Sequence, residues 1–339
     1  MTRARVLHVA PGEAAGAELA EAAAVLRAGG LVAFPTETVY GLGANALDPG
    51  AVARIFAAKG RPADNPVIVH APDAATAWRV TTGPTPLALR LADAFWPGPL
   101  TLVLQAADEL PRAATAGLPS VAVRVPDHPV ALALLRVAGV PVAAPSANRS
   151  GRPSPTTAAH VLADLGEVVD VVVDGGPCRV GVESTVVDAR GDVPVVLREG
   201  GITREQLLAA AGVGAVEGAT RAEDLAASPG TRHRHYAPTC RVVIAEAGAA
   251  EAVAERLAAD PVRRVGIVVR GGGAATGVQE IARYADAADL AEQLYGALRA
   301  AEAAGVTDLV VEAVAETGIG RAVMDRLRRA AEGSGPAAG

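Results

Sequence analysis

FPTETVYGLG, residues 34–43, joins the end of a short apolar run to a segment with two threonines, one glutamate and two glycines. We expect Leu31–Phe34 to form a buried strand, because the run is short, apolar and followed by polar residues and glycines. Glycines allow backbone amides to approach a ligand closely, and the threonine and glutamate side chains add polar groups. Alternatively, the segment is a tight turn whose threonines bond their own backbone. The stretch therefore predicts either a ligand-binding turn or a purely structural one.

Short apolar runs alternate with amphipathic segments on both sides of this stretch, which predicts an α/β fold. Asp48-Pro49 has the form of an N-cap followed by proline at the first helical position, and the helix is expected to end at Gly60. Further helices are expected at 18–27, 86–95, 129–137 and 157–165. Strands are expected at 67–70, 100–104, 121–125, 142–144, 169–173, 184–187 and 195–198.

The length of 339 residues favours two domains over a single core. An Ala- and Gly-rich stretch from about Gly212 interrupts the alternating pattern, and it ends in SPGTRHRHYAP, residues 228–238. Strands are expected again at 241–244, 264–269 and 308–311, separated by helical segments. We therefore predict a catalytic domain at 1–212, a linker or lid at 213–240 and a smaller α/β domain at 241–339.

Composition narrows the class of protein. Half of the residues are hydrophobic but only 3% are aromatic, which predicts a core of small aliphatic side chains packed between helices and sheets. The two cysteines lack metal-ligand spacing, so we expect neither a disulfide framework nor a metal site. The first 30 residues lack a secretion-signal pattern and no run is long enough to span a bilayer, so we expect a cytoplasmic protein without membrane contact. The net charge of −6 argues against a general nucleic-acid coat but not against a local basic groove.

Lys59 is the only lysine among the 31 lysine and arginine residues. It is followed by Gly60 and Arg61 at the predicted end of a helix. The two cations could complement the helix dipole, or they could clamp a polyphosphate with a point charge and a planar fork.

Polar residues recur where strands are predicted to end, which is where ligands of α/β sheets collect. Ser120 and Arg124 share one face of a predicted strand, and an arginine buried on an apolar strand requires an anionic partner. The other polar positions of this kind are His70, the segment APSAN at 144–148, Ser154, Glu183-Ser184-Thr185 and Arg198. The patterns HExxH, CxxC, GxSxG and GxxxxGK[ST] are absent, which argues against a metal hydrolase, a serine hydrolase and a P-loop NTPase.

Taken together, the blocks PTETVYGL, KGRPADNPVIVH, WPGPLTLVL, VAVRVP, APSAN, GVESTVVD and LREG resemble the Sua5/YrdC family. The block SPGTRHRHYAP with a following α/β domain resembles the longer Sua5 type. The resemblance implies a twisted sheet with a deep concave cavity and a Rossmann-like C-terminal domain. It also implies a nucleotidyltransferase that uses ATP, L-threonine and bicarbonate to make L-threonylcarbamoyladenylate, with Mg²⁺ carried by the triphosphate. A downstream transferase then passes the threonylcarbamoyl group to adenosine 37 of tRNA.

The resemblance also implies roles for single residues, assigned by motif position. The residues expected to hold threonine are Thr38, His70, Arg124, Ala144 and Ser184. Those expected to contact the nucleotide are Arg61, Asn65, Ser120, Ser146, Ser154, Arg198 and His233. Lys59, Arg61, Ser146 and Asn148 fall on the K-x-R and S-x-N pairs and are expected to be catalytic. Members of the family often carry Tyr at the position of His233 and Met at that of Thr231.

Three alternatives remain at this point. The first is a protein of the same fold that binds double-stranded RNA or tRNA through Arg54, Arg61, Arg149, Arg152 and Arg198 without making an adenylate. The second is a carbamoyltransferase domain like those of hydrogenase maturation proteins, and the third is a catalytically silent relative. In the C-terminal domain, GIGR at 318–321 precedes a helix and is either an anion site or, more simply, a structural turn.

Overall fold

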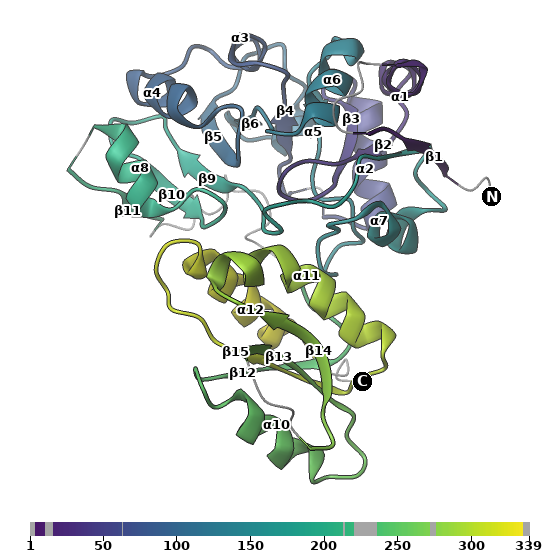
Figure 1. Ribbon diagram of the computed structural model, residues 1–339. Helices are drawn as coiled ribbons and strands as arrows, with labels where there is room; N and C mark the ends of the chain where they lie inside the picture. Colours follow the sequence, from purple (N-terminus) through teal and green to yellow (C-terminus); the bar gives the residue numbers. More distant parts are fainter. Residues whose placement is uncertain are drawn as a thin grey trace. The chain divides into compact units, whose positions relative to one another are not determined.

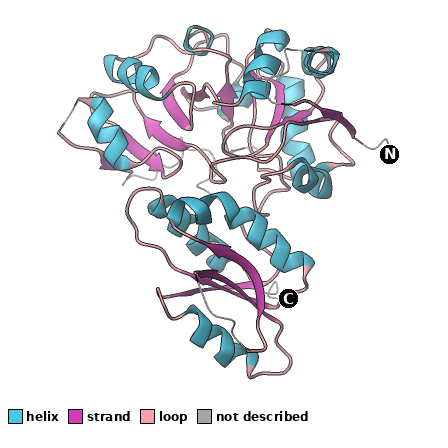
Figure 2. Ribbon diagram, in the orientation of Figure 1, coloured by secondary structure: helices cyan, strands magenta, loops and turns pink. Residues whose placement is uncertain are grey.

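The computed structural model describes residues 4–10, 16–62, 64–212, 214–219, 236–271 and 276–334. The chain forms two compact units. The first holds residues 1–150, 154–179 and 183–232, and the second holds 151–153, 180–182 and 233–339. Figure 1 colours both along the sequence, and Figure 2 marks their helices and strands.

The first unit is built on an 11-stranded mixed sheet with the order β1-β8-β2-β3-β7-β4-β6-β5-β9-β10-β11. The strands are β1 (Arg5–His8), β2 (Val32–Phe34), β3 (Gly41–Asn45), β4 (Ile68–His70), β5 (Leu100–Gln105), β6 (Ser120–Arg124), β7 (Val142–Ala143), β8 (Val171–Asp174), β9 (Thr185–Asp188), β10 (Val195–Arg198) and β11 (Glu217–Gly218). The predicted strands are confirmed within two residues at each end, whereas β1, β3 and β11 were not expected. β11 pairs with β10, so part of the predicted linker belongs to this sheet.

Helices cover the sheet of the first unit. They are α1 (Ala17–Arg27), α2 (Pro49–Lys59), α3 (Ala74–Trp78), α4 (Pro86–Phe95), α5 (Arg112–Thr115), α6 (Pro129–Ala138), α7 (Ala158–Leu165) and α8 (Arg204–Ala211). The predicted cap of α2 is confirmed, because the Asp48 carboxylate accepts hydrogen bonds from the amides of Gly50 and Ala51. β2 shows how the layers form: Leu31 and Ala33 belong to one apolar cluster, and Val32 and Phe34 belong to another. Both faces of this strand are therefore covered.

The quoted stretch at 34–43 is the tip of a hairpin, because Gly41–Asn45 pairs antiparallel with β2. Gly43 is needed for packing: a Cβ atom there would lie 2.8 Å from the Phe34 ring and 2.9 Å from the Val142 side chain. Close packing thus accounts for this glycine, and its expected role in bringing the backbone to a ligand stays a prediction. Thr36 makes the backbone contacts expected of a tight turn, since its Oγ1 accepts hydrogen bonds from the amides of Thr38 and Val39.

The second unit contains a four-stranded parallel sheet with the order β12-β15-β13-β14. Its elements are β12 (Arg241–Ala245), α10 (Ala250–Ala258), β13 (Val265–Arg270), β14 (Gln279–Tyr284), α11 (Ala287–Ala303), β15 (Asp308–Glu312) and α12 (Gly320–Gly333). α10 lies on one face of this sheet, and α11 and α12 lie on the other (Figure 1). This three-layer arrangement agrees with the predicted Rossmann-like unit. The GIGR segment leads into the first turn of α12.

Candidate active site

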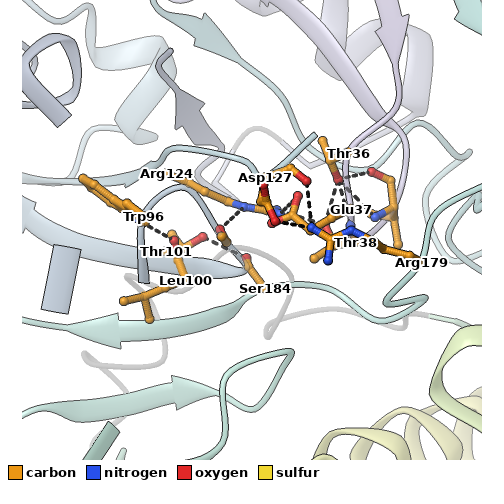
Figure 3. Close-up of polar contacts among 12 residues, drawn as sticks. Thr36, Glu37, Thr38, Trp96, Leu100, Thr101, Arg124, Asp127, Arg179 and Ser184 are labelled. Atoms are coloured by element: carbon orange, nitrogen blue, oxygen red, sulfur yellow. Dashed lines mark hydrogen bonds and ion pairs between the residues drawn. The ribbon is translucent and has the colours of Figure 1, made fainter. Parts of the chain in front are cut away.

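Four residues predicted to bind threonine lie together near the ends of neighbouring strands in the large sheet. His70 and Arg124 end the parallel strands β4 and β6, where they are paired in register. β9 runs parallel to β5, which is antiparallel to β6, so Ser184 directly before β9 lies at the same end of these strands. Thr38 comes from the hairpin, and its Oγ1 accepts a hydrogen bond of 3.0 Å from Nη1 of Arg124. We call Thr38, His70, Arg124 and Ser184 the threonine group; Figure 3 shows three of them.

Ser184 connects this group to a residue predicted to bind nucleotide. Its Oγ lies 2.8 Å from Oγ1 of Thr101 on β5. Arg198, at the end of β10, donates to the Ser184 carbonyl at 2.9 Å and to its Oγ at 3.2 Å. Ser154 donates at 2.6 Å to the carboxylate of Glu183, the residue directly before Ser184. Arg198 and Ser154 therefore contact residues 183–184, the segment that carries Ser184 of the threonine group.

Five residues predicted to bind nucleotide or to be catalytic form a second cluster between the end of α2 and the loop after β7. We call Lys59, Arg61, Asn65, Ser146 and Asn148 the loop group. The Lys59 amino group donates to the backbone carbonyls of Ser146 and Asn148, each at 2.5 Å. Ser146 Oγ donates to Oδ1 of Asn148 at 2.6 Å, and Arg61 bonds the carbonyls of Asn65 and Pro66. The K-x-R and S-x-N pairs are thus brought together by direct contact.

Ala144 and Ser120 belong to neither cluster. Ala144 donates its amide to the carbonyl of Ile68 at 2.8 Å, two residues before His70. Ser120 begins β6 and Arg124 ends it, so the two are about 13 Å apart at the usual rise of a strand. His233 lies outside the described residues. The sites predicted for threonine and nucleotide therefore extend along the length of β4 and β6.

Burial controls the protonation of two site residues. Desolvation, aided by the charge of Arg61, holds the pKa of Lys59 well below its usual value, and Asp164 opposes this shift. Desolvation, aided by the charge of Arg124, lowers the pKa of His70 to about 3. The His70 ring packs edge-on against Phe34 with 6.1 Å between centroids. His70 is therefore a neutral side chain near pH 7.

We predict that His70 makes stability fall in mild acid. Its pKa is about 3 in the folded chain and about 6.5 when unfolded, so the unfolded state binds the proton first. This contribution is complete above pH 6.5 and declines by up to about 1.4 kcal/mol per pH unit below it. Urea unfolding of wild type and His70→Asn at pH 7.5 and 5.5 measures the effect. We expect wild type to lose about 1 kcal/mol more than the variant, and equal losses would contradict the prediction.

Sequence reasoning quoted three further residues of the site without giving them roles. Glu37 forms a buried ion pair with Arg124, Thr101 contacts Ser184, and Glu183 accepts from Ser154. Each lies inside a motif used for the resemblance, but no local pattern shows which distant side chain it meets. Only the fold reveals these partners.

Three further features of the described residues concern a cavity, metal ligands and membrane-spanning helices. A cavity of about 820 Å³ in the first unit is lined by other residues, among them His8, Asp127, His128, Asp174 and Arg179. Within the described ranges, no cluster of three or more His, Cys, Asp or Glu side chains is arranged to hold a metal ion. No described helix combines the length and apolar character needed to cross a membrane.

Comparison with known proteins identifies the family. Residues 24–200 match the Sua5/YciO/YrdC family model, described as "Telomere recombination", and residues 202–332 match the "Threonylcarbamoyl-AMP synthase, C-terminal domain". The threonylcarbamoyl-AMP synthase of Bacillus subtilis is 46% identical over 93% of this chain and 93% of its own length. That of Pyrococcus abyssi is 44% identical over 91% of this chain and 92% of its own length.

A solved structure shows the same fold. The Pyrococcus abyssi Sua5 protein complexed with L-threonine matches with a TM-score of 0.89 and 41% identity, over 98% of this chain and 99% of that one. Two family models, two relatives and a solved structure thus agree on the family and on the α/β architecture. The chain belongs to the Sua5/YrdC family of threonylcarbamoyl-AMP synthases, in the form that carries a C-terminal Sua5 domain.

Proposed function

We propose that the chain makes L-threonylcarbamoyl-AMP from L-threonine, bicarbonate and ATP, and releases pyrophosphate. The observation that carries this proposal is the buried guanidinium of Arg124, surrounded by the hydroxyl of Thr38 and the neutral ring of His70. A planar guanidinium suits the α-carboxylate of an amino acid. The likeness over almost the whole chain to a solved complex with L-threonine supports this substrate.

The proposed chemistry has two steps. The threonine amine adds to the carbon of bicarbonate, and loss of water leaves a carbamate. A carbamate oxygen then attacks the α-phosphorus of ATP, a new P–O bond forms, and the bond to pyrophosphate breaks. Neither step requires a covalent enzyme intermediate, so holding two anionic reactants in line supplies most of the catalysis.

Neither cysteine is a candidate nucleophile. Burial raises the pKa of Cys178 to about 12 and that of Cys240 to about 11, so both stay as thiols near neutral pH. In our proposal the threonine group binds the amino acid, and the loop group, with Ser120, Ser154 and Arg198, binds the nucleotide. Mg²⁺ would arrive with the triphosphate, whose oxygens are its usual ligands, and would neutralise charge there.

The RNA-binding alternative is less well supported. The guanidinium of Arg54 bonds Asp170 and the Gly29 carbonyl, that of Arg149 bonds the Asp164 carbonyl, and that of Arg152 bonds Glu302. Side chains held in this way offer fewer donors to phosphates. Transfer of the product to tRNA by a partner enzyme, direct tRNA contact and a cytoplasmic location remain predictions.

Pyrophosphate release tests the proposal. Purified protein is incubated with ATP, Mg²⁺ and L-threonine, with bicarbonate either added or removed by purging with carbon-dioxide-free gas. We expect release only when threonine and bicarbonate are both present, and slower release with L-valine, which lacks the hydroxyl. Release that no amino acid stimulates, together with salt-sensitive RNA binding, would overturn the synthase in favour of the RNA-binding protein.

A further inference from the structure

Glu37 carries a fully buried carboxylate in the first unit. Glu37 is 0% exposed and Arg124 is 3% exposed. Oε2 of Glu37 lies 2.7 Å from Nη2 of Arg124. Within the described residues, neither carboxylate oxygen of Glu37 has a hydrogen bond of good geometry. A charge in this position is costly to bury, and its partner is the arginine assigned to the substrate carboxylate. The ion pair therefore calls for an explanation within the site.

Arg124 is held from three directions. Its Nε donates to the Gly98 carbonyl at 3.2 Å, its Nη1 donates to Thr38, and its Nη2 faces Glu37. Thr38 is fixed in turn, because its Oγ1 lies 2.8 Å from Oγ1 of Thr36. Figure 3 shows Glu37 and Thr38 of the hairpin meeting Arg124 from β6. Three contacts at three nitrogens define the plane of the guanidinium, and each terminal nitrogen still has a second N–H.

Glu37 is not placed to react with a ligand. It has no exposed surface, whereas a general base must come within hydrogen-bond reach of the proton that it removes. The group lies near buried side chains: its charge acts on the pKa values of His128 and Cys178, where burial has the larger effect. These neighbours leave Arg124 as the side chain through which Glu37 acts on the site.

We propose that Glu37 is a positioning residue that holds the Arg124 guanidinium with its free N–H groups turned toward the α-carboxylate of the amino-acid substrate. This inference rests on the proposed role of Arg124. It explains why the hairpin carries a carboxylate between two threonines: Thr36 fixes Thr38, and Thr38 and Glu37 then fix the two terminal nitrogens of one guanidinium. Preorganised donors bind an anion without a further ordering cost.

Three substitutions separate position from charge. Glu37→Gln keeps the length and an acceptor oxygen but removes the charge. Glu37→Asp keeps the charge but withdraws it by one methylene, and Glu37→Ala removes both. A positioning role predicts that Glu37→Ala and Glu37→Asp weaken L-threonine binding by about tenfold. It predicts that Glu37→Gln weakens this binding by about threefold or less. A role in charge compensation alone predicts the reverse order, with Asp close to wild type and Gln close to Ala.

The readout is the dissociation constant of the full-length protein for L-threonine and for L-threoninol, which lacks the carboxylate. We expect the preference for threonine over threoninol to collapse in Glu37→Asp and Glu37→Ala, while the KM for ATP is unchanged. Asp188→Ala is the matched control, because it removes the Arg190 ion pair of β9 outside both site clusters. Equal weakening for both ligands and for ATP would show a general structural effect and would overturn the proposal.

Arg124→Gln distinguishes this inference from the function on which it rests. Loss of the preference in Arg124→Gln but not in the Glu37 variants overturns the positioning role and leaves the role of Arg124 intact. An unchanged preference in both sets overturns the assignment of the carboxylate to Arg124, and with it the positioning role. Loss in Arg124→Gln, Glu37→Asp and Glu37→Ala, with Glu37→Gln close to wild type, is the expected result.

Discussion

Replacement of Arg124 by alanine is expected to raise the KM for L-threonine by about 100-fold, equivalent to roughly 3 kcal/mol. The guanidinium is almost fully buried, so its bond to a carboxylate is weakly screened and no solvent cation takes its place. The KM for ATP is expected to change little, because Arg124 bonds Gly98, Thr38 and Glu37, none of which belongs to the loop group that we assign to the nucleotide. Initial rates of pyrophosphate release at varied threonine and at varied ATP measure both constants.

The single variant also leaves Glu37 as a buried carboxylate without its partner, which costs about 3–5 kcal/mol in comparable cases. The same measurement is therefore made in the double variant Arg124→Ala/Glu37→Ala, which removes both charges. Arg190→Ala is the control, since its ion pair with Asp188 is outside both clusters. A threonine KM close to wild type in the double variant would show that another group binds the carboxylate.

The sequence predicted the placement of Arg124 better than its partner. Alternation over residues 121–125 put Arg124 on the opposite face from Val121, Val123 and Val125, and the three valines do lie in one apolar cluster. The rule that a buried arginine requires an anion was also correct. The anion, however, comes from Glu37, 87 residues earlier, and one sequence contains no signal that pairs positions so far apart. Periodicity describes a local backbone, whereas ion pairs depend on the order of strands.

The unexpected strand β3 shows a second limit. GLGAN, residues 41–45, has no β-branched residue and two glycines, so its own propensity disfavours a strand. It is extended because β2 and β7 pair with it on both sides, and because Gly43 leaves room for the Phe34 ring. Pairing partners overrode local preference here. The contacts within the loop group could not be predicted either. Lys59 bonds backbone carbonyls, and because every residue has one, no sequence pattern identifies these partners.

Lys59→Met is expected to lower kcat for pyrophosphate release by about 100-fold, with a smaller change in the KM for threonine. The Lys59 amino group bonds the carbonyls of Ser146 and Asn148, so it joins the end of α2 to the loop that carries the S-x-N pair. Methionine fills a similar volume but donates no hydrogen bond. A displacement of about 1 Å at groups that position a reacting phosphate is enough for a loss of this size.

The same contacts predict an effect on stability that a direct bond to phosphate would not produce. One buried and one partly buried carbonyl lose their donor in Lys59→Met, which is expected to lower the free energy of unfolding by about 2 kcal/mol. Arg54→Met is the control on the same helix, because Arg54 is exposed and its ion pair with Asp170 contributes about 0–1 kcal/mol. Urea unfolding without ligands measures both variants.

Lys59→Arg decides between the two roles of this lysine. A flat guanidinium is larger than an amino group and cannot reach two carbonyls 2.5 Å from a single nitrogen, so a role in holding the loop predicts no rescue. A role as a point charge on the triphosphate predicts partial rescue, together with normal stability and a raised KM for ATP in Lys59→Met. We expect Lys59→Arg to be as slow as Lys59→Met, because the described structure already uses the amino group to shape the loop on which Ser146 and Asn148 lie.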